Sequence, residues 1–332
     1  MRSSIQGLDS MTEIEEKPRT QISAGSTTPA QQVDVGQVVN RMSPNDFVMK
    51  PEESMSQLVW RRFRRHRLAV ASGLVLFVLA AICFISPLFI SEEAANTVDL
   101  NNMLQPPSWK HLFGMDAVGR NMLMRCIFGG RISLRIGILA ALIAVTIGIA
   151  VGAVAGYNVG WIDNILMRFT EAIMSIPTLF ILIVLGRVLG PSIAITTVII
   201  GMLAWMGTAR IVRAEILSLK EQDFVLAARA IGVPPRRILI RHLLPNVVAP
   251  IVVSATLRVG QAIIMEAALS FLGLGVQPPT ATWGNMLSRA QGYLRDAPWI
   301  AFFPGLLILI TVLCVNFVGD GLRDAMDPHA LR

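Results

Sequence analysis

The fold is decided by residues 68–90, which read LAVASGLVLFVLAAICFISPLFI. This stretch holds 23 residues and no charged side chain. As an α-helix it would rise about 34 Å, enough to cross a hydrocarbon core of about 30 Å. A helix in the core of a soluble protein rarely stays uncharged over such a length. The stretch therefore predicts a transmembrane helix.

The composition of the whole chain agrees with a membrane protein. Of its 332 residues, 53% are hydrophobic and 15% are charged, and the mean hydropathy is +0.58. A soluble domain carries about 25% charged residues. The net charge of +7 could indicate a nucleic-acid partner, but the arginines cluster beside apolar runs, where membrane proteins use them to fix orientation. We therefore expect a lipid bilayer around the chain and no nucleic acid.

A basic cluster, WRRFRRHR at residues 60–67, comes directly before the first apolar run. Such a cluster with an interfacial tryptophan keeps its end of the helix in the cytoplasm. A nucleic-acid patch is the weaker alternative, because the cluster adjoins a transmembrane helix. The N-terminus is therefore expected in the cytoplasm.

Further apolar runs follow the first. They predict transmembrane helices at residues 134–157, 168–189, 192–214, 247–272 and 299–318. The run at 168–189 is interrupted by Glu171, Pro177 and Arg187. The expected fold class is all-α: a polytopic membrane protein with six transmembrane helices and both termini in the cytoplasm.

The loops between these helices can be assigned to the two sides of the membrane. Residues 215–246 fall on the cytoplasmic side and, with their flank, are rich in positive charge, as the positive-inside rule requires. The basic residues there are Arg210, Arg213, Lys220, Arg229, Arg236, Arg237 and Arg241. The first external loop, about residues 91–133, departs from the rule, because it carries Lys110, Arg120, Arg125 and Arg131. It is long and has acidic partners, and the rule is statistical, so the topology is kept.

Residues 1–50 differ from the rest of the chain. They are rich in Ser, Thr, Gln and Glu and show no apolar period and no signal-peptide core, so we expect a disordered cytoplasmic tail. Either Met1 or Met11 could be the start of the protein. The three cysteines form no spaced framework, and we expect neither disulfides nor a metal site.

Small residues recur every four positions in the second predicted helix. They are Ala140, Ala144, Gly148, Gly152 and Gly156. Such a stripe lets two helix backbones approach closely in lipid. It predicts close helix packing along this face and no function of its own. No inverted repeat of the secondary-transporter kind is visible in the two halves of the chain.

The cytoplasmic loop contains the stretch KEQDFVLAARAIGVPPRR at residues 220–237. It predicts a short helix through Ile231, a stop at Gly232, and a second helix that opens at the prolines and runs to Leu244 and Pro245. A helix–glycine–helix elbow of this kind can dock into the groove of a partner. An ordinary ordered loop is the alternative that the residues alone leave open.

The same loop resembles the signature of ABC importer permeases, EAA-x3-G-x9-I-x-L-P. The residues that match at the right spacing are Ala227, Ala228, Gly232, Leu244 and Pro245. Leu226 stands in place of the glutamate and His242 in place of the isoleucine. The resemblance implies a coupling helix, with Leu226 in it, that sits in a cleft of the ATPase subunit and transmits its closure to the pore.

Further stretches resemble the C-type permeases of the dipeptide, oligopeptide and nickel importers. They are residues 111–121, 131–134, 155–157, 161–163, 166–168, 270–279, 283–284 and 319–328. Asn121 replaces the aspartate common in these permeases. The resemblance covers about residues 55–329 and implies the six-helix fold of type I ABC importer permeases.

The resemblance also divides the chain into segments. Residues 55–105 form an N-terminal permease segment with the first transmembrane helix, and residues 106–133 form an external loop. Residues 131–322 form the permease transmembrane domain with its coupling loop at 215–246, and residues 323–332 form a cytoplasmic C-terminal tail.

The sequence carries no motif for ATP binding or catalysis. None of the four lysines follows a glycine as a P-loop requires, and there is no HExxH, GxSxG or Cys/His metal spacing. The chain is therefore expected to be no enzyme and to hold no cofactor and no metal. The resemblance implies that one or two separate ABC ATPase subunits bind ATP. It also implies a second permease subunit and a substrate-binding protein outside the membrane as partners.

Charged residues within the predicted helices are candidates for function by default. They are Glu171, Arg187, Arg258 and Glu266. We expect Glu171, Arg258 and Glu266 to line a cavity or to pair in the interior. A proton-driven carrier would need such acids around a central cavity, but acids are few and no repeat symmetry is visible, so ATP-driven transport is favoured. A membrane scaffold without transport is a third alternative.

The resemblance implies alternating access in a bacterial inner membrane, with peptides as the solute. Permeases of this kind also import glutathione, nickel chelates and opines. Specificity is expected to lie mostly in the binding protein, so no residue of this chain selects among these solutes.

Overall fold

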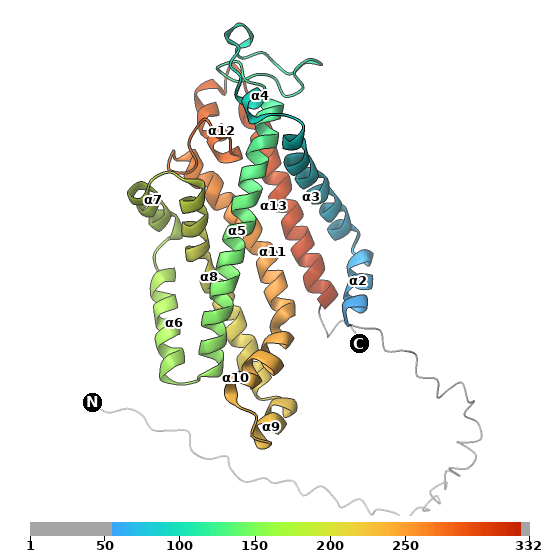
Figure 1. Cartoon of the computed structure of the whole chain (residues 1–332), viewed down its shortest axis with the longest axis vertical. Coiled ribbons are helices and arrows are strands. Elements are labelled where there is room, and N and C mark those ends of the chain that lie inside the picture. The colour runs from blue at the N-terminus through green and yellow to red at the C-terminus, as the bar shows by residue number, and fades with distance from the viewer. Residues whose placement is uncertain (1–54, 327–332) are drawn as a thin grey trace, which may run out of the picture. The chain divides into compact units, whose positions relative to one another are not determined.

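The structure, a computed structural model, describes residues 55–326 (Figure 1). The tail predicted at residues 1–50 and the last residues, 327–332, lie outside this range. The described part contains no β-strand, and its α-helices are joined by turns and short 3-10 and π-helical segments. The helices are α2 (Met55–Arg65), α3 (Arg67–Ile85), α4 (Glu92–Asn96), α5 (Met122–Tyr157), α6 (Trp161–Met174), α7 (Thr178–Leu189), α8 (Ile193–Lys220), α9 (Asp223–Ala230), α10 (Pro235–Arg237), α11 (Val248–Phe271), α12 (Trp283–Ala290) and α13 (Trp299–Met326).

Among the described residues, the helices that are long and apolar enough to span a membrane number five, or six if α6 and α7 together form one span, as predicted. α6 and α7 meet at 81°, so the span predicted at residues 168–189 is broken at the interruption noted in the sequence. Pro177 explains the break, because proline cannot donate a helical hydrogen bond and disfavours helical backbone at the residue before it. The all-α, multi-pass fold class is confirmed.

The last part of the external loop predicted at residues 106–133 is helical, because α5 begins at Met122. The Asn121 side chain accepts hydrogen bonds from the N–H groups of Leu123 and Met124 at 3.0 and 3.3 Å, which caps the helix. At 36 residues α5 is about 54 Å long, so it extends beyond a hydrocarbon core of about 30 Å.

The predicted C-terminal tail, residues 323–332, begins within α13. α13 continues to Met326, so residues 323–326 are helical. Gly319 and Gly321 do not stop the helix, because they pack closely against Thr256 of α11 and Ala69 of α3. Tertiary contact here outweighs the low helix propensity of glycine.

The contact between α5 and α8, here called the α5/α8 seam, is the most extensive in the bundle, and α11 packs against both helices. Figure 1 shows the three helices running alongside one another. The small-residue stripe of α5 lies in the seam. A Cβ added to Gly148 would lie 2.6 Å from the Thr208 Cβ, and one added to Gly152 would lie 2.9 Å from the Val212 Cβ. The predicted close packing along this face is confirmed.

The seam predicts a sharp sensitivity to one added methyl group. Gly148→Ala should destabilise the bundle by about 1–3 kcal/mol, because the new methyl group collides with Thr208. Thr208 is held in place, since its hydroxyl oxygen lies 3.0 Å from that of Ser254 on α11. Thermal unfolding in detergent measures the change.

Gly73→Ala is the matched control for this variant. A Cβ at Gly73 would have no neighbouring atom closer than 3.8 Å, so its stability should stay the same or rise slightly with the better helix propensity of alanine. Equal stability of the two variants would contradict the role of the seam.

Candidate coupling elbow and polar groove

The chain between α8 and α11 begins with an elbow, defined here as residues 221–235, at the lower end of Figure 1. Its helix α9 turns Val225 and Ala228 into a buried apolar cluster. The other buried members come from α5, from α8 and from the segment that leads into α11: Ala153, Val212, Ile216, Ile238, Leu243 and Val247. Apolar packing therefore fastens α9 to the bundle and to the segment that follows it.

Gly232 ends α9 in a Schellman motif. Its φ is +79°, a left-handed conformation that favours glycine. The Gly232 N–H donates to the Arg229 carbonyl and the Val233 N–H donates to the Ala228 carbonyl, both at 3.0 Å. α10 and a π-helical turn then lead into α11. The predicted helix–glycine–helix geometry is confirmed.

The elbow exposes three large apolar side chains among polar ones. The exposed fractions are 43% for Phe224, 45% for Leu226 and 80% for Ile231. Ala227 is exposed beside them, whereas Ala228 is buried against the bundle. Large apolar side chains exposed on a firmly packed helix suit the docking of a partner.

The last two residues carried over from the signature lie away from this face. Leu244 and Pro245 form a 3-10 turn at the start of α11. Leu244 packs against the apolar cluster beneath α9, and Pro245 is exposed. These two residues therefore shape the return into the membrane, while Leu226 and Ala227 are presented outward.

Two polar contacts join neighbouring helices at the end of the bundle that carries the elbow. Arg213 Nε and Nη2 donate to the two carboxylate oxygens of Asp163 at 2.5 and 2.6 Å. The Lys220 ammonium donates to the Tyr157 carbonyl at 2.6 Å. These contacts tie α8 to α6 and α5. Sequence reasoning missed both, because partners 50 and 63 residues apart leave no local signal.

A hollow of about 680 Å³, here called the polar groove, opens between α6, α8 and α11. Its charged lining residues are Arg168, Glu171, Arg210, Arg213 and Arg258. Arg168 Nη1 donates to Glu171 Oε2 at 3.2 Å. The structure thus brings two of the predicted polar residues, Glu171 and Arg258, to one hollow.

Glu266, the third predicted polar residue, lies elsewhere in the interior. It is fully buried, and its two oxygens accept hydrogen bonds from the hydroxyl groups of Ser133 and Ser270 at 3.1 and 2.8 Å. The Ser133 oxygen in turn accepts from the Trp283 N–H at 3.2 Å. This chain of contacts joins α5, α11 and α12 and is structural in character.

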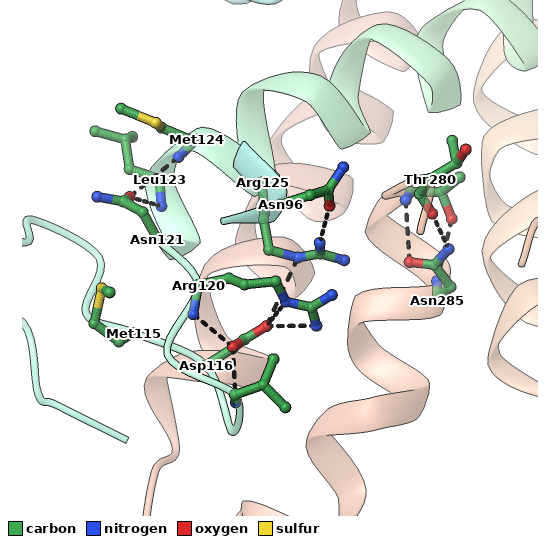
Figure 2. A network of polar contacts seen from close by, with 12 residues as sticks. Asn96, Met115, Asp116, Arg120, Asn121, Leu123, Met124, Arg125, Thr280 and Asn285 are labelled. Atoms are coloured by element: carbon green, nitrogen blue, oxygen red, sulfur yellow. Dashed lines mark hydrogen bonds and ion pairs between the residues drawn. The ribbon is translucent and has the colours of Figure 1, made fainter. Parts of the chain in front are cut away.

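A second network, the Asp116 network, lies at the end of the bundle opposite the elbow (Figure 2). Asp116 Oδ1 accepts from the N–H groups of Val118 and Arg120 at 3.0 and 2.8 Å. Its Oδ2 accepts from Arg120 Nε at 2.7 Å and lies 3.8 Å from Arg125 Nε. Arg125 Nη1 also donates to the Asn96 side chain at 2.7 Å. The network fixes the segment before α5 onto the start of that helix.

The Asp116 network explains part of the positive charge in the predicted external loop, which departs from the positive-inside rule. Arg120 and Arg125 are buried and share one carboxylate instead of facing solvent. The spacing of Asp116 and Arg120, four residues apart, is a local signal that could have found this pair. Within residues 55–326, no three His, Cys, Asp or Glu side chains lie together as a metal site would require.

Comparison with known proteins identifies the family. Residues 148–332, more than half of the chain, match the family described as binding-protein-dependent transport system inner membrane component. The chain belongs to this family. The permease matches a second family at residues 54–107, the N-terminal TM domain of oligopeptide transport permease C. Both matches confirm the resemblance seen in the sequence.

The permease is similar to transport proteins over most of its length. It is 44% identical to the oligopeptide transport system permease protein OppC of Haemophilus influenzae, over 83% of this chain and 89% of the relative. It is 38% identical to the dipeptide transport system permease protein DppC of Alkalihalophilus pseudofirmus, over 86% and 96%. It is 42% identical to the glutathione transport system permease protein GsiD of Escherichia coli, over 81% and 89%.

A solved structure shares the fold of the permease. A chain of the MetNI methionine ABC transporter, in an inward-facing conformation, matches with a TM-score of 0.52 at 20% identity. The match covers 62% of this permease and 98% of that chain. At this identity the likeness concerns the fold alone. It confirms the expected type I ABC importer permease fold.

The Asp116 network predicts a strong dependence on one carboxylate. Asp116→Asn should destabilise the permease by about 3–5 kcal/mol, because two buried arginines lose the negative charge that they share. Thermal unfolding in detergent measures the loss, and limited proteolysis reports whether the segment before α5 opens. Glu93→Gln, which changes an exposed acid of α4 in the same region, should leave both unchanged. A wild-type melting temperature for Asp116→Asn would contradict this role.

Proposed function

We propose that the chain is the membrane-spanning permease subunit of an ABC importer and forms, with a second permease, the translocation path for peptides. The observation that carries the proposal is the elbow. α9 is fastened to α8 and to the segment that leads into α11 by buried apolar contacts, while Phe224, Leu226 and Ile231 are exposed. Relatives named oligopeptide and dipeptide permeases support peptides as the solute.

The partners follow from this role. The elbow docks into a cytoplasmic ABC ATPase subunit, of which the complex has one or two, and these subunits bind the ATP. This chain has no ATPase site and no cofactor of its own. A substrate-binding protein on the outer side delivers the peptide, in line with the family description. The complex lies in the bacterial inner membrane.

Both termini of the chain are assigned to the cytoplasm. α2 and α3 pack against α13, and His66 Nε2 lies 3.7 Å from Asp324 Oδ2. This contact supports one common side for the start of the first span and the end of the last. The arginines of α2 favour the cytoplasm for that side by the positive-inside rule.

The mechanism is alternating access. Closure of the ATPase subunits pushes on α9, and the shared apolar cluster passes the push to α8 and α11. The two permeases rock to open outward, and the peptide enters from the binding protein. ATP hydrolysis then resets the inward-facing state.

Glutathione is the second candidate solute, because one relative at 42% identity is named a glutathione permease. Nickel chelates and opines are further alternatives within the same transporter type. A proton-coupled carrier is disfavoured, because Glu171 pairs with Arg168 and both oxygens of Glu266 accept hydrogen bonds.

Uptake in the native host tests the solute and the energy source. Deletion of the gene should abolish uptake of labelled di-, tri- or pentapeptides, and ATP depletion should do the same in the wild type. Survival of all peptide uptake in the deletion strain would overturn the peptide assignment. Loss with a proton uncoupler while ATP persists would overturn the ABC assignment.

The elbow predicts a separate effect at Gly232. Gly232→Pro should reduce uptake at least about tenfold, because proline cannot adopt a positive φ and has no N–H for the Arg229 carbonyl. Membrane insertion should be unchanged. Gly232→Asn is the matched control, since asparagine tolerates the left-handed conformation and keeps the N–H, and it should retain most of the uptake. Wild-type uptake by the proline variant would argue against coupling through the elbow.

A further inference from the structure

Arg258 lies near the middle of α11. A charged side chain in a membrane span is energetically costly, so such residues usually have a function. Its side chain lines the polar groove and also a second hollow of about 290 Å³ between α7, α8 and α11. The lining of this second hollow, here called the apolar hollow, includes Leu182, Leu203, Ala262 and Met265. The guanidinium therefore stands between a polar space and an apolar one.

Neighbouring residues hold the guanidinium at this junction. It rests against Gly207 of α8, where an added Cβ would lie 3.2 Å from Arg258 Cζ and would collide with Nη2. Gln261, one turn along α11, accepts a hydrogen bond from Nη1 at 2.7 Å. The glycine thus provides the space for the group, and the glutamine orients it.

The capacity of Arg258 to donate hydrogen bonds is largely unused. A guanidinium carries five N–H donors. In the described part of the chain its acceptor is Gln261, and Nε is buried without a partner. No carboxylate of residues 55–326 forms an ion pair with it. A buried donor without an acceptor is destabilising, so a ligand that supplies an acceptor here is stabilised.

The acids of α6 and α11 already have partners, and Glu215 of α8 is exposed and does not line the polar groove. Asp163 on α6 binds Arg213, and Glu171 on α6 binds Arg168. Glu266 on α11 accepts from two serines in the interior. The polar groove, with four arginines and one glutamate in its lining, therefore has an excess of positive charge.

A ligand group that fits beside Arg258 must accept hydrogen bonds and carry negative charge. A carboxylate fits both requirements, because its two oxygens match the planar fork of a guanidinium. Transported peptides carry one such group at a fixed place, the C-terminus, whatever their side chains. The apolar hollow next to the guanidinium has the size and lining to take one apolar side chain.

We propose that Arg258 binds the C-terminal carboxylate of the transported peptide, with the side chain of the last peptide residue in the apolar hollow. This inference rests on the proposed peptide function and adds an orientation to it. The peptide ammonium group is repelled by the positive groove and points away from Arg258. Because the site reads a main-chain group, it accepts peptides of varied sequence.

The test is uptake by the complete importer in proteoliposomes, using an apolar tripeptide and the same tripeptide with an amidated C-terminus. Each variant's rate is divided by the wild-type rate for the same peptide, so that selection by the binding protein cancels. Arg258→Gln should lower uptake of the free acid at least about tenfold, the effect of losing a charged hydrogen bond, and change uptake of the amide less than about twofold. Arg258→Lys should lower uptake of the free acid to a value between those of the wild type and Arg258→Gln, since lysine keeps the positive charge but lacks the planar guanidinium.

Arg187→Gln is the matched control. Arg187 is an exposed arginine of α7 that lines neither hollow, and its loss should change neither ratio. An equal loss for the acid and the amide in Arg258→Gln would overturn the proposal, because Arg258 would then have a structural role. A wild-type importer that takes up neither peptide would overturn the proposed function, and the inference with it.

A second measurement reports the orientation directly. A benzophenone group placed on the last residue of the tripeptide should label Met265 during turnover, and Arg258→Gln should abolish the label. The same group on the first residue should label other positions. Labelling of Met265 from the first residue, or labelling that does not depend on Arg258, would overturn the proposed orientation.

Discussion

Close approach of two helix backbones is the constraint on which the rest of this structure depends. In lipid, an apolar side chain gains little by moving from a tail to a neighbouring helix, so association relies on tight van der Waals contact. Small residues of α5 provide that contact along α8, and α11 packs against both helices. The polar groove and the elbow are both built on α8 and α11, so their geometry follows from the seam.

Much of this frame could be predicted from the sequence, because apolar length is a direct physical requirement for crossing a membrane. Helix ends and bends were harder to predict. Hydropathy identifies the part of a helix that lies within the hydrocarbon. It does not show that α5 begins before the predicted residue 134, directly after the capping residue Asn121. Pro177 was noted as an interruption, but a proline does not specify the direction in which the chain continues, and α7 packs against α8 and α11 at 81° to α6.

The candidate site was predictable where its signals are local. Glycine and proline at the elbow specify a helix stop and a restart, and the structure contains both. The side of a membrane-spanning helix on which a charged residue lies could not be related to its neighbours from the sequence. Arg258 and Glu266 lie on the same helix, about 80° apart around its axis, so one faces the groove and the other faces α5 and α12. Contacts such as Asp163 with Arg213 depend on chain topology and leave no trace in either neighbourhood.

The length of α5 has a mechanical consequence. The Asp116 network holds this helix near its first turn, and Lys220 holds the carbonyl of its last residue. A stiff helix that is held at both ends moves as one body, so its two ends cannot move independently of each other. What remains is pivoting, in which the ends swing in opposite directions. Over a strut of about 54 Å, a tilt of about 10° around the midpoint displaces each end by about 5 Å.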